Sequence, residues 1–238
     1  MASRTEEPVD RRAQILDAAV AVISRRGVDR ARLADVAEEA DVSLGLVQHY
    51  FRTRERLLVE TFRREQERIS SIWLNAVPAG SDPLLRLVEY LRLSSPEGGE
   101  GAATAFDPGW SFWLEFWSKA NRDEEIRAEF RDIYNEFAEL FGAAIRDGVQ
   151  RGEFHPTCDA GDAADRLISL IDGVAMRTLL GGLDRRRMLP LLIGALTSEL
   201  GLTAAQRRRA ARYASRKPAG PGGAGGSRSG RQLAGGRD

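Results

Sequence analysis

The sequence predicts an all-α protein with a short N-terminal unit of three helices and a larger helical domain after it. Apolar residues recur at three- and four-residue spacing along most of the chain, and no segment shows the two-residue alternation of a half-buried strand. Residues suited to capping stand directly before several of these periodic segments. A polar turn between two short periodic segments, within residues 33–56, predicts a helix-turn-helix.

Composition limits the class of protein. With 238 residues, 42% of them hydrophobic, the chain can bury one or two cores. The polar first residues predict no secretory signal, and the longest apolar stretch, Met188–Leu196, is too short to span a bilayer. Cys158 is the single cysteine, which excludes an intramolecular disulfide and a cysteine zinc site. We expect a cytoplasmic protein without a membrane segment.

The formal charge of zero combines three differently charged segments. Residues 1–68 hold 13 basic and 13 acidic side chains, residues 69–205 hold 13 and 21, and residues 206–238 hold 9 and 1. The first segment is neutral, the second carries −8 and the third +8. Because nucleic-acid binding depends on where charge lies, the overall charge neither favours nor excludes it.

The first expected helix begins after Asp10, a suitable N-cap, and ends at Gly27. Residues 1–9 are polar, and we expect them to be disordered. The second helix follows the apolar stripe of Leu33, Val36, Ala37 and Ala40. Asp41 tolerates the left-handed conformation of a turn.

Ser43 is placed to cap the third helix, and Thr53 to cap a long fourth helix that continues to Trp73. Together these elements predict a helix-turn-helix DNA-binding domain over residues 10–56. On the third helix we expect Tyr50 to place its ring on the core side with Val42, Val47 and Phe51.

The outward side of the third helix suits a base-reading surface. Gln48 can form paired hydrogen bonds with adenine, Leu44 and Leu46 can contact thymine methyl groups, and Gly45 lets the backbone approach the duplex. Ordinary packing is the alternative for both leucines. Phosphate contacts are expected from His49 and from residues at the start of the fourth helix. The predicted DNA-binding residues are Arg32, Ser43, Leu44, Gly45, Leu46, Gln48, His49, Tyr50, Thr53 and Arg54. His49 has no neighbour at metal-ligand spacing, so no metal site is predicted.

These N-terminal motifs resemble the TetR (tetracycline-repressor) family over about residues 10–60. The likeness is carried by Gly27, Leu33–Ala37, Val42-Ser43, Gln48–Phe51, Thr53–Glu55 and Leu57-Leu58. It implies a transcriptional repressor that dimerises, reads a palindromic operator and leaves it when a small molecule binds. Two positions depart from the pattern: Asp41 replaces the usual turn glycine, and Arg32 replaces a capping Ser or Thr. The second departure weakens the cap by ~1 kcal/mol or supplies a phosphate contact.

Further helices are expected to form an effector-binding and dimerisation domain over residues 57–205. Their periodic segments begin at Pro83, then cover 110–119, 123–151, 160–180 and 185–200, with 94–109 as a loop. Helices 160–180 and 185–200 resemble the family's four-helix dimer interface. Residues 206–238 are basic and glycine-rich, so we expect a disordered tail that either adds salt-sensitive attraction to DNA or only solubilises the chain.

Aromatic residues in the larger domain predict a ligand cavity. Aromatic faces attract cations, and the acidic body reinforces a preference for a cationic effector, although a plain hydrophobic core is the alternative. Asp172 faces either solvent or a pocket or dimer interface. The predicted ligand-binding residues are Tyr90, Trp113, Phe116, Trp117, Tyr134, Phe137 and Asp172. No cofactor is predicted.

Three C-terminal motifs, Trp113–Trp117, Arg151–Phe154 and Leu170–Gly173, resemble the subgroup that contains the choline-responsive repressor of glycine-betaine synthesis. Many members of that subgroup respond to unrelated ligands, so we expect a small-molecule effector that is either cationic or hydrophobic. The alternatives are a DNA-binding regulator without a ligand, a helical small-molecule carrier, or an enzyme. An enzyme is disfavoured because His49 and His155 lie far apart in the sequence and no glycine-rich phosphate loop is present.

Overall fold

The computed structural model describes residues 10–77, 80–95 and 106–215, and within these ranges it contains helices and no strand. The all-α prediction is confirmed. The helices are α1 (Arg11–Arg26), α2 (Leu33–Glu39), α3 (Leu44–Phe51), α4 (Arg54–Asn75), α5 (Pro83–Leu93), α6 (Phe106–Ala120), α7 (Glu124–Gln150), α8 (Ala160–Leu179), α9 (Met188–Glu199) and α10 (Ala204–Ala214), with short 3-10 turns η1 (Val28–Arg30) and η3 (Arg185–Arg187).

The predicted caps of the first, third and fourth helices are found in place. The Asp10, Ser43 and Thr53 side chains each accept hydrogen bonds from backbone N–H groups in the first turn of the helix that follows. Asp41 has a φ of 51°, so it adopts the left-handed turn conformation that glycine usually supplies. At the start of α2, the Asp35 carboxylate accepts from the backbone N–H of Arg32, which partly compensates for the missing capping side chain.

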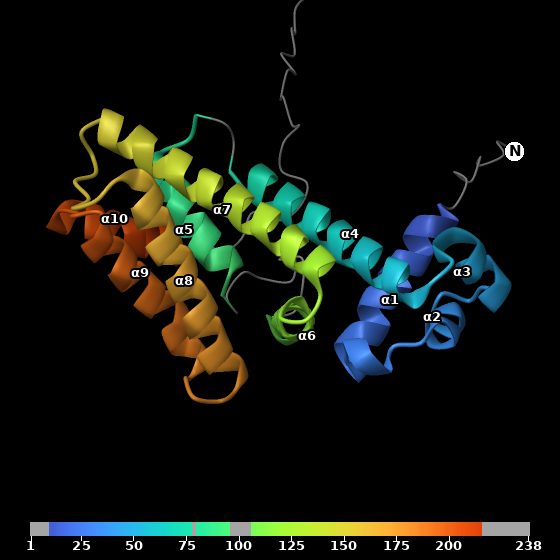
Figure 1. Cartoon of the computed structure of the whole chain (residues 1–238). Helices are drawn as coiled ribbons and strands as arrows, with labels where there is room; N and C mark the ends of the chain where they lie inside the picture. The colour runs from blue at the N-terminus through green and yellow to red at the C-terminus, as the bar shows by residue number, and fades with distance from the viewer. Residues whose placement is uncertain (1–9, 78–79, 96–105, 216–238) are drawn as a thin grey trace, which may run out of the picture.

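Figure 1 shows α1, α2 and α3 gathered at one end of the molecule and α8, α9 and α10 at the other, with α4 and α7 running along its length. We call α1–α3 the head. Its core contains Phe51 and Val47, and it continues without interruption into Phe62 of α4, Phe116 of α6 and Phe130 of α7. A second core lies among α5, α7, α8, α9 and α10. Because the first core crosses residue 56, the division into units 10–56 and 57–205 stays a proposal.

The prediction of disorder from residue 206 was wrong for its first part, because α10 covers Ala204–Ala214. A capping box joins Thr203 and Gln206, and Ala210 is fully buried. Arg209 pairs with Glu153 at 2.6 Å. These contacts offset the ordering entropy of a segment that composition alone assigned to the tail. The other segments expected to be disordered, 1–9 and 216–238, lie outside the described residues.

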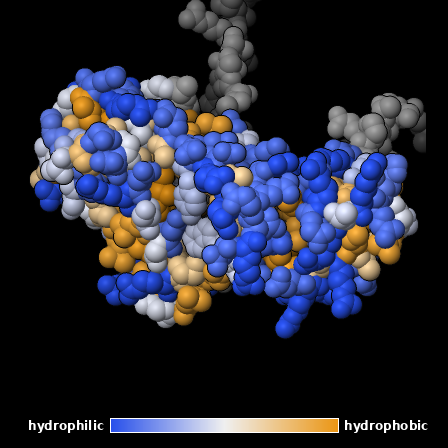
Figure 2. All heavy atoms as spheres, in the orientation of Figure 1, coloured by the Kyte–Doolittle hydropathy of each residue, from blue (hydrophilic) through white to orange (hydrophobic). Residues whose placement is uncertain are grey.

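Apolar side chains gather on the surface over α8 and α9 (Figure 2). Leu180 at the end of α8 is 70% exposed and Leu191 of α9 is 41% exposed. Exposed apolar side chains that cluster in this way mark a candidate interaction surface. No helix in the described part of the chain is long and apolar enough to cross a membrane.

Candidate functional site

Helix α3 presents its polar side chains outward on a rigid base. Val47 and Phe51 are fully buried and anchor the helix in the head core, whereas Leu44, Gln48 and His49 are exposed. The Ser43 hydroxyl oxygen accepts a hydrogen bond of 3.2 Å from the backbone N–H of Leu46. The helix therefore offers a row of accessible side chains whose positions are fixed by packing behind them, as base reading requires.

The structure corrects the prediction for Tyr50 on α3 and bears on the two alternatives that were left open for Leu46. Tyr50 is 39% exposed, so its ring does not belong to the core; it lies edge-on to His49, with 5.6 Å between the ring centroids. Leu46 is half-buried and packs against the head core, so packing takes part of the side chain that was expected to face thymine. A helix of eight residues shows only a narrow buried face, and Val47 and Phe51 already fill it. Gly45 lies on the open side, where an added Cβ would meet only the Ser43 hydroxyl oxygen, at 4.0 Å.

The Arg54 guanidinium, which was expected to contact phosphate, forms hydrogen bonds within the protein. Its Nε donates to the carbonyl of Ala31 at 2.8 Å, and its Nη2 donates to the carbonyl of Val28. The side chain is 28% exposed. Arg54 thus fastens the start of α4 to the segment between α1 and α2, and Arg32 and Thr53 remain exposed beside it.

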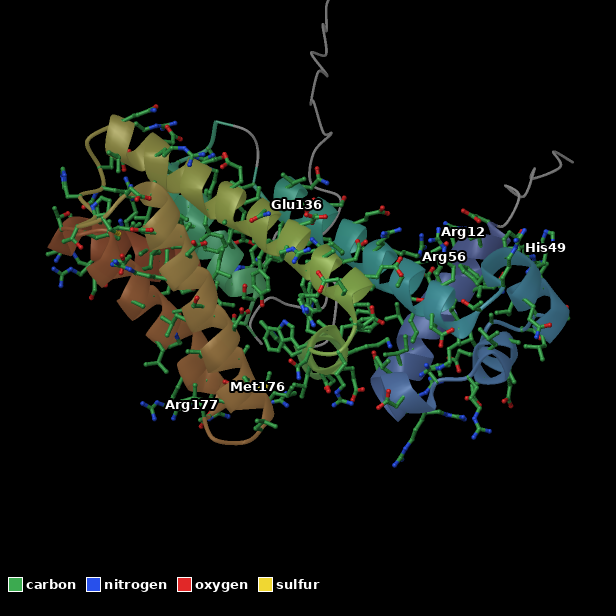
Figure 3. The ribbon with its side chains drawn as sticks, in the orientation of Figure 1. Arg12, His49, Arg56, Glu136, Met176 and Arg177 are labelled. Atoms are coloured by element: carbon green, nitrogen blue, oxygen red, sulfur yellow. The ribbon has the colours of Figure 1, made fainter. Side chains whose placement is uncertain are left out.

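A carboxylate holds two other arginines at the junction of α1 and α4. Glu60 accepts from Arg12 and from Arg56, the latter at 2.6 Å, and Figure 3 shows these two arginines together on the side of the head that also carries His49. Arg12 also lies over the Phe51 ring, 5.8 Å from its centroid. Both side chains are about half exposed, so they can offer free N–H groups to phosphate.

An apolar cavity of about 100 Å³ lies among α4, α6, α7 and α8. Its polar groups include the carboxylate of Asp172, and its aromatic walls come from three helices. The lining residues are Ile69, Ile72, Trp73, Leu93, Ser94, Gly109, Trp110, Trp113, Trp117, Ile133, Tyr134, Phe137, Phe141, Ile168, Ile171 and Asp172. A water needs about 10–15 Å³ of such volume, so the cavity has room for a compact organic molecule.

The cavity brings together five of the seven residues that the sequence suggested: Trp113, Trp117, Tyr134, Phe137 and Asp172. The other two do not line it. Phe116 is fully buried in the head core, where its ring centroid stacks 4.7 Å from that of Phe62, and Tyr90 stacks behind Trp73 at 5.6 Å.

Trp73 and Trp110 also line the cavity, although the sequence did not predict them as ligand-binding residues. The spacing of Trp110, Trp113 and Trp117 along α6 was the available signal, because positions three and four apart share one helix face. Nothing in the local sequence of α4 indicated that Trp73 would meet the same cavity.

Asp172 supplies negative charge in this apolar setting. Its carboxylate accepts a hydrogen bond of 2.8 Å from the Tyr134 hydroxyl. Burial raises the pKa of Asp172 to about 6, while the hydrogen bond from Tyr134 acts in the opposite direction. Burial and the neighbouring carboxylate raise the pKa of Tyr134, so the tyrosine stays a neutral donor. An ionised carboxylate inside an aromatic enclosure is suited to an organic cation.

Among the described residues no cluster of three or more His, Cys, Asp or Glu side chains has a metal-binding arrangement. His49 stands at the outer end of the head and His155 lies beyond α7, near α9, where its backbone N–H donates to Leu200.

Comparison with known proteins finds a matching family for the N-terminal helices and another for the C-terminal helices. Residues 15–61 match the family described as bacterial regulatory proteins of the tetR family, and residues 101–201 match the C-terminal domain of BetI-type transcriptional repressors. The chain is 30% identical over 188 residues to the HTH-type transcriptional regulator BetI of Burkholderia cenocepacia, which covers 76% of this chain and 89% of that relative.

Two solved structures share the fold. A putative transcriptional regulator from Saccharomonospora viridis in complex with choline is 28% identical, with a TM-score of 0.69 over 78% of this chain and 94% of that one. A putative TetR-family regulator from Rhodococcus sp. is 24% identical, with a TM-score of 0.69 over 80% and 99%. The chain belongs to the TetR family of bacterial transcriptional regulators, with a C-terminal part of the BetI type.

Proposed function

We propose that this regulator is a repressor that holds a palindromic operator as a homodimer and leaves it when a quaternary ammonium compound of the choline class enters the cavity. The observation that carries the effector class is the enclosure of one carboxylate, Asp172, by the aromatic rings of α4, α6 and α7. A quaternary ammonium cation has no N–H to donate, so it gains more from aromatic faces and one negative charge than from a hydrogen-bonding network.

The DNA half of the proposal assigns different tasks to different side chains. Gln48 reads a base edge, and Leu44 contacts a thymine methyl group, because both are exposed on α3. Arg12, Arg56 and Arg32 supply phosphate contacts that carry little sequence information. Arg54 contributes by holding the head in shape rather than by touching DNA.

The dimer half rests on α8 and α9. Leu180 at the end of α8 and Leu191 of α9 are exposed. Figure 2 shows apolar side chains gathered over these two helices, at the end of the molecule away from the head. Two-fold pairing there leaves both heads free to enter successive major grooves, whose centres lie about 34 Å apart along the duplex. Light scattering at micromolar concentration tests this part, and a monomer would contradict it.

Calorimetric titration with choline tests the effector class. We expect binding that is lost when Asp172→Asn removes the charge and strongly weakened when Trp117→Ala removes one wall. Spermidine, whose protonated amines need several hydrogen-bond acceptors, tests the preference for a quaternary ammonium group. A neutral isostere of choline, 3,3-dimethylbutanol, tests the need for a positive charge. Tighter binding of the neutral isostere than of choline would contradict the cationic assignment. It would leave the DNA-binding part intact.

A further inference from the structure

We infer that Glu115 is the positioning residue through which occupancy of the cavity reaches the head. This inference deepens the proposed function and rests on it for the identity of the effector. Glu115 lies on α6, yet its carboxylate accepts a hydrogen bond of 2.8 Å from the backbone N–H of Val28, in the 3-10 turn between α1 and α2. The two residues are separated by 87 positions in the sequence.

The contact is closely fitted. Gly27 has a φ of 81°, which turns the chain so that the Val28 N–H points at α6. An added Cβ on Gly27 would lie 3.1 Å from one Glu115 carboxylate oxygen and 3.3 Å from the other. A side chain at Gly27 would therefore both strain the backbone and press on the carboxylate, and glycine satisfies both requirements.

The α6 helix faces the head and the cavity at once. Phe112 and Phe116 are buried in the head core. Trp113 and Trp117, on another face of the same helix, line the cavity. Since a helix moves as a rigid body over so few turns, a ligand that displaces the tryptophans also displaces Glu115.

The same segment is held from a second side. Arg54, at the first position of α4, donates to the carbonyls of Val28 and Ala31, so the peptide groups around Val28 are bound by α4 and by α6. The cavity is lined by both helices, with Trp73 on α4 and Trp113 on α6. A ligand that prefers one relative position of α4 and α6 therefore prefers one orientation of the head.

There is room for such a change. A surface pocket of about 140 Å³ lies beside the contact, lined by Val28, Glu115 and Lys119 among others. The Glu115 carboxylate thus borders open space as well as the turn, so its movement with α6 meets no packed side chain on the side of the pocket. The contact is a polar link between α6 and the head, and it lies beside the continuous apolar core of the head.

The test compares Glu115→Ala and Glu115→Gln with wild type and with Glu139→Ala. Glu139 is a matched control, because it is an exposed α7 carboxylate that pairs only with Arg146 among the described ion pairs. Three quantities are measured: the choline Kd by calorimetry, the Kd for a duplex selected by the wild-type protein from random sequences, with and without saturating choline, and amide exchange across residues 27–33.

We expect Glu115→Ala to keep choline affinity within about twofold of wild type and to reduce the choline-dependent ratio of DNA Kd values at least fivefold, the lower end of typical allosteric coupling. Amide exchange at Val28 should rise about tenfold with the loss of a charged hydrogen bond. Glu115→Gln, whose side-chain carbonyl can still accept from Val28, should restore most of the coupling, and Glu139→Ala should match wild type.

If the ratio of DNA Kd values with and without choline is the same in Glu115→Ala as in wild type, the inference is overturned. Failure of the proposed effector gives a different pattern, in which choline leaves the wild-type DNA Kd unchanged. In that case the exchange measurement still decides the role of Glu115: faster exchange at Val28 with weaker DNA binding supports it, and unchanged exchange rejects it.

Discussion

Asp172→Asn should change how the free energy of unfolding depends on pH, with no ligand present. The carboxylate lies in an aromatic cavity and keeps one hydrogen bond, from the Tyr134 hydroxyl. An asparagine fits the same space and can still accept from Tyr134, but it cannot ionise. The substitution therefore removes the cost of a buried charge and leaves most contacts in place.

The magnitude follows from the pKa of Asp172, which burial raises from 3.8 to about 6. Below pH ~3 both the folded and the unfolded chain are largely protonated at this position, so the charge costs little. As the pH rises from about 3 to 6, the unfolded chain releases this proton before the folded chain does, and stability falls. A shift of about two pKa units corresponds to about 3 kcal/mol, of which roughly 2–3 kcal/mol develops between pH 4 and pH 8.

Urea unfolding of wild type and Asp172→Asn at pH 4, 5, 6 and 8, at one protein concentration, measures this difference. Other titrating groups affect both proteins alike and cancel. We expect the variant to gain about 2–3 kcal/mol relative to wild type between pH 4 and pH 8. A difference that is constant over this range would refute the buried, proton-retaining carboxylate.

Four other substitutions have outcomes that the structure specifies. Gln48→Ala should relax preference at one base pair of the selected duplex by ~1–3 kcal/mol, seen by repeating the selection with the variant. Arg54→Ala should weaken binding to all sequences yet leave the slope of log K against log salt unchanged, because its guanidinium holds Val28 and Ala31 rather than phosphate; a slope reduced by about one would place it on the DNA. Gly148→Ala should destabilise the protein by ~1–3 kcal/mol or more in urea, since the new Cβ would lie 2.0 Å from the Phe154 ring. Gly45→Ala, in open space on α3, should instead stabilise by up to ~1 kcal/mol while weakening DNA binding, and a loss of stability there would contradict the open environment.

Much of the head could be predicted from the sequence because its signals are local. Asp10, Ser43 and Thr53 cap the helices that follow them, and a cap depends only on the residues within one turn. Tyr50 was assigned wrongly because a short helix has too few residues to define its buried face by periodicity. The hydrogen bonds of Arg54 within the head could not be predicted, because its partners are backbone carbonyls more than twenty positions away.

The cavity was predictable only in part. Trp113 and Trp117 share a face with Trp110, so the spacing of aromatic residues indicated one wall. Phe116 was expected to line the cavity but packs on Phe62, whereas Trp73 was not expected there and does line it. The aromatic residues that surround a void depend on how four helices cross. The Glu115–Val28 contact joins residues that no sequence pattern relates.

The decisive measurement is the affinity of the wild-type protein for its selected palindromic duplex, by fluorescence anisotropy at fixed salt, with and without choline at a concentration that calorimetry shows to be saturating. We expect choline to weaken DNA binding at least about fivefold, and DNA to weaken choline binding by the same factor, since coupling between two ligands is reciprocal. Choline that binds with measurable heat but leaves the DNA Kd unchanged would contradict an effector-released repressor.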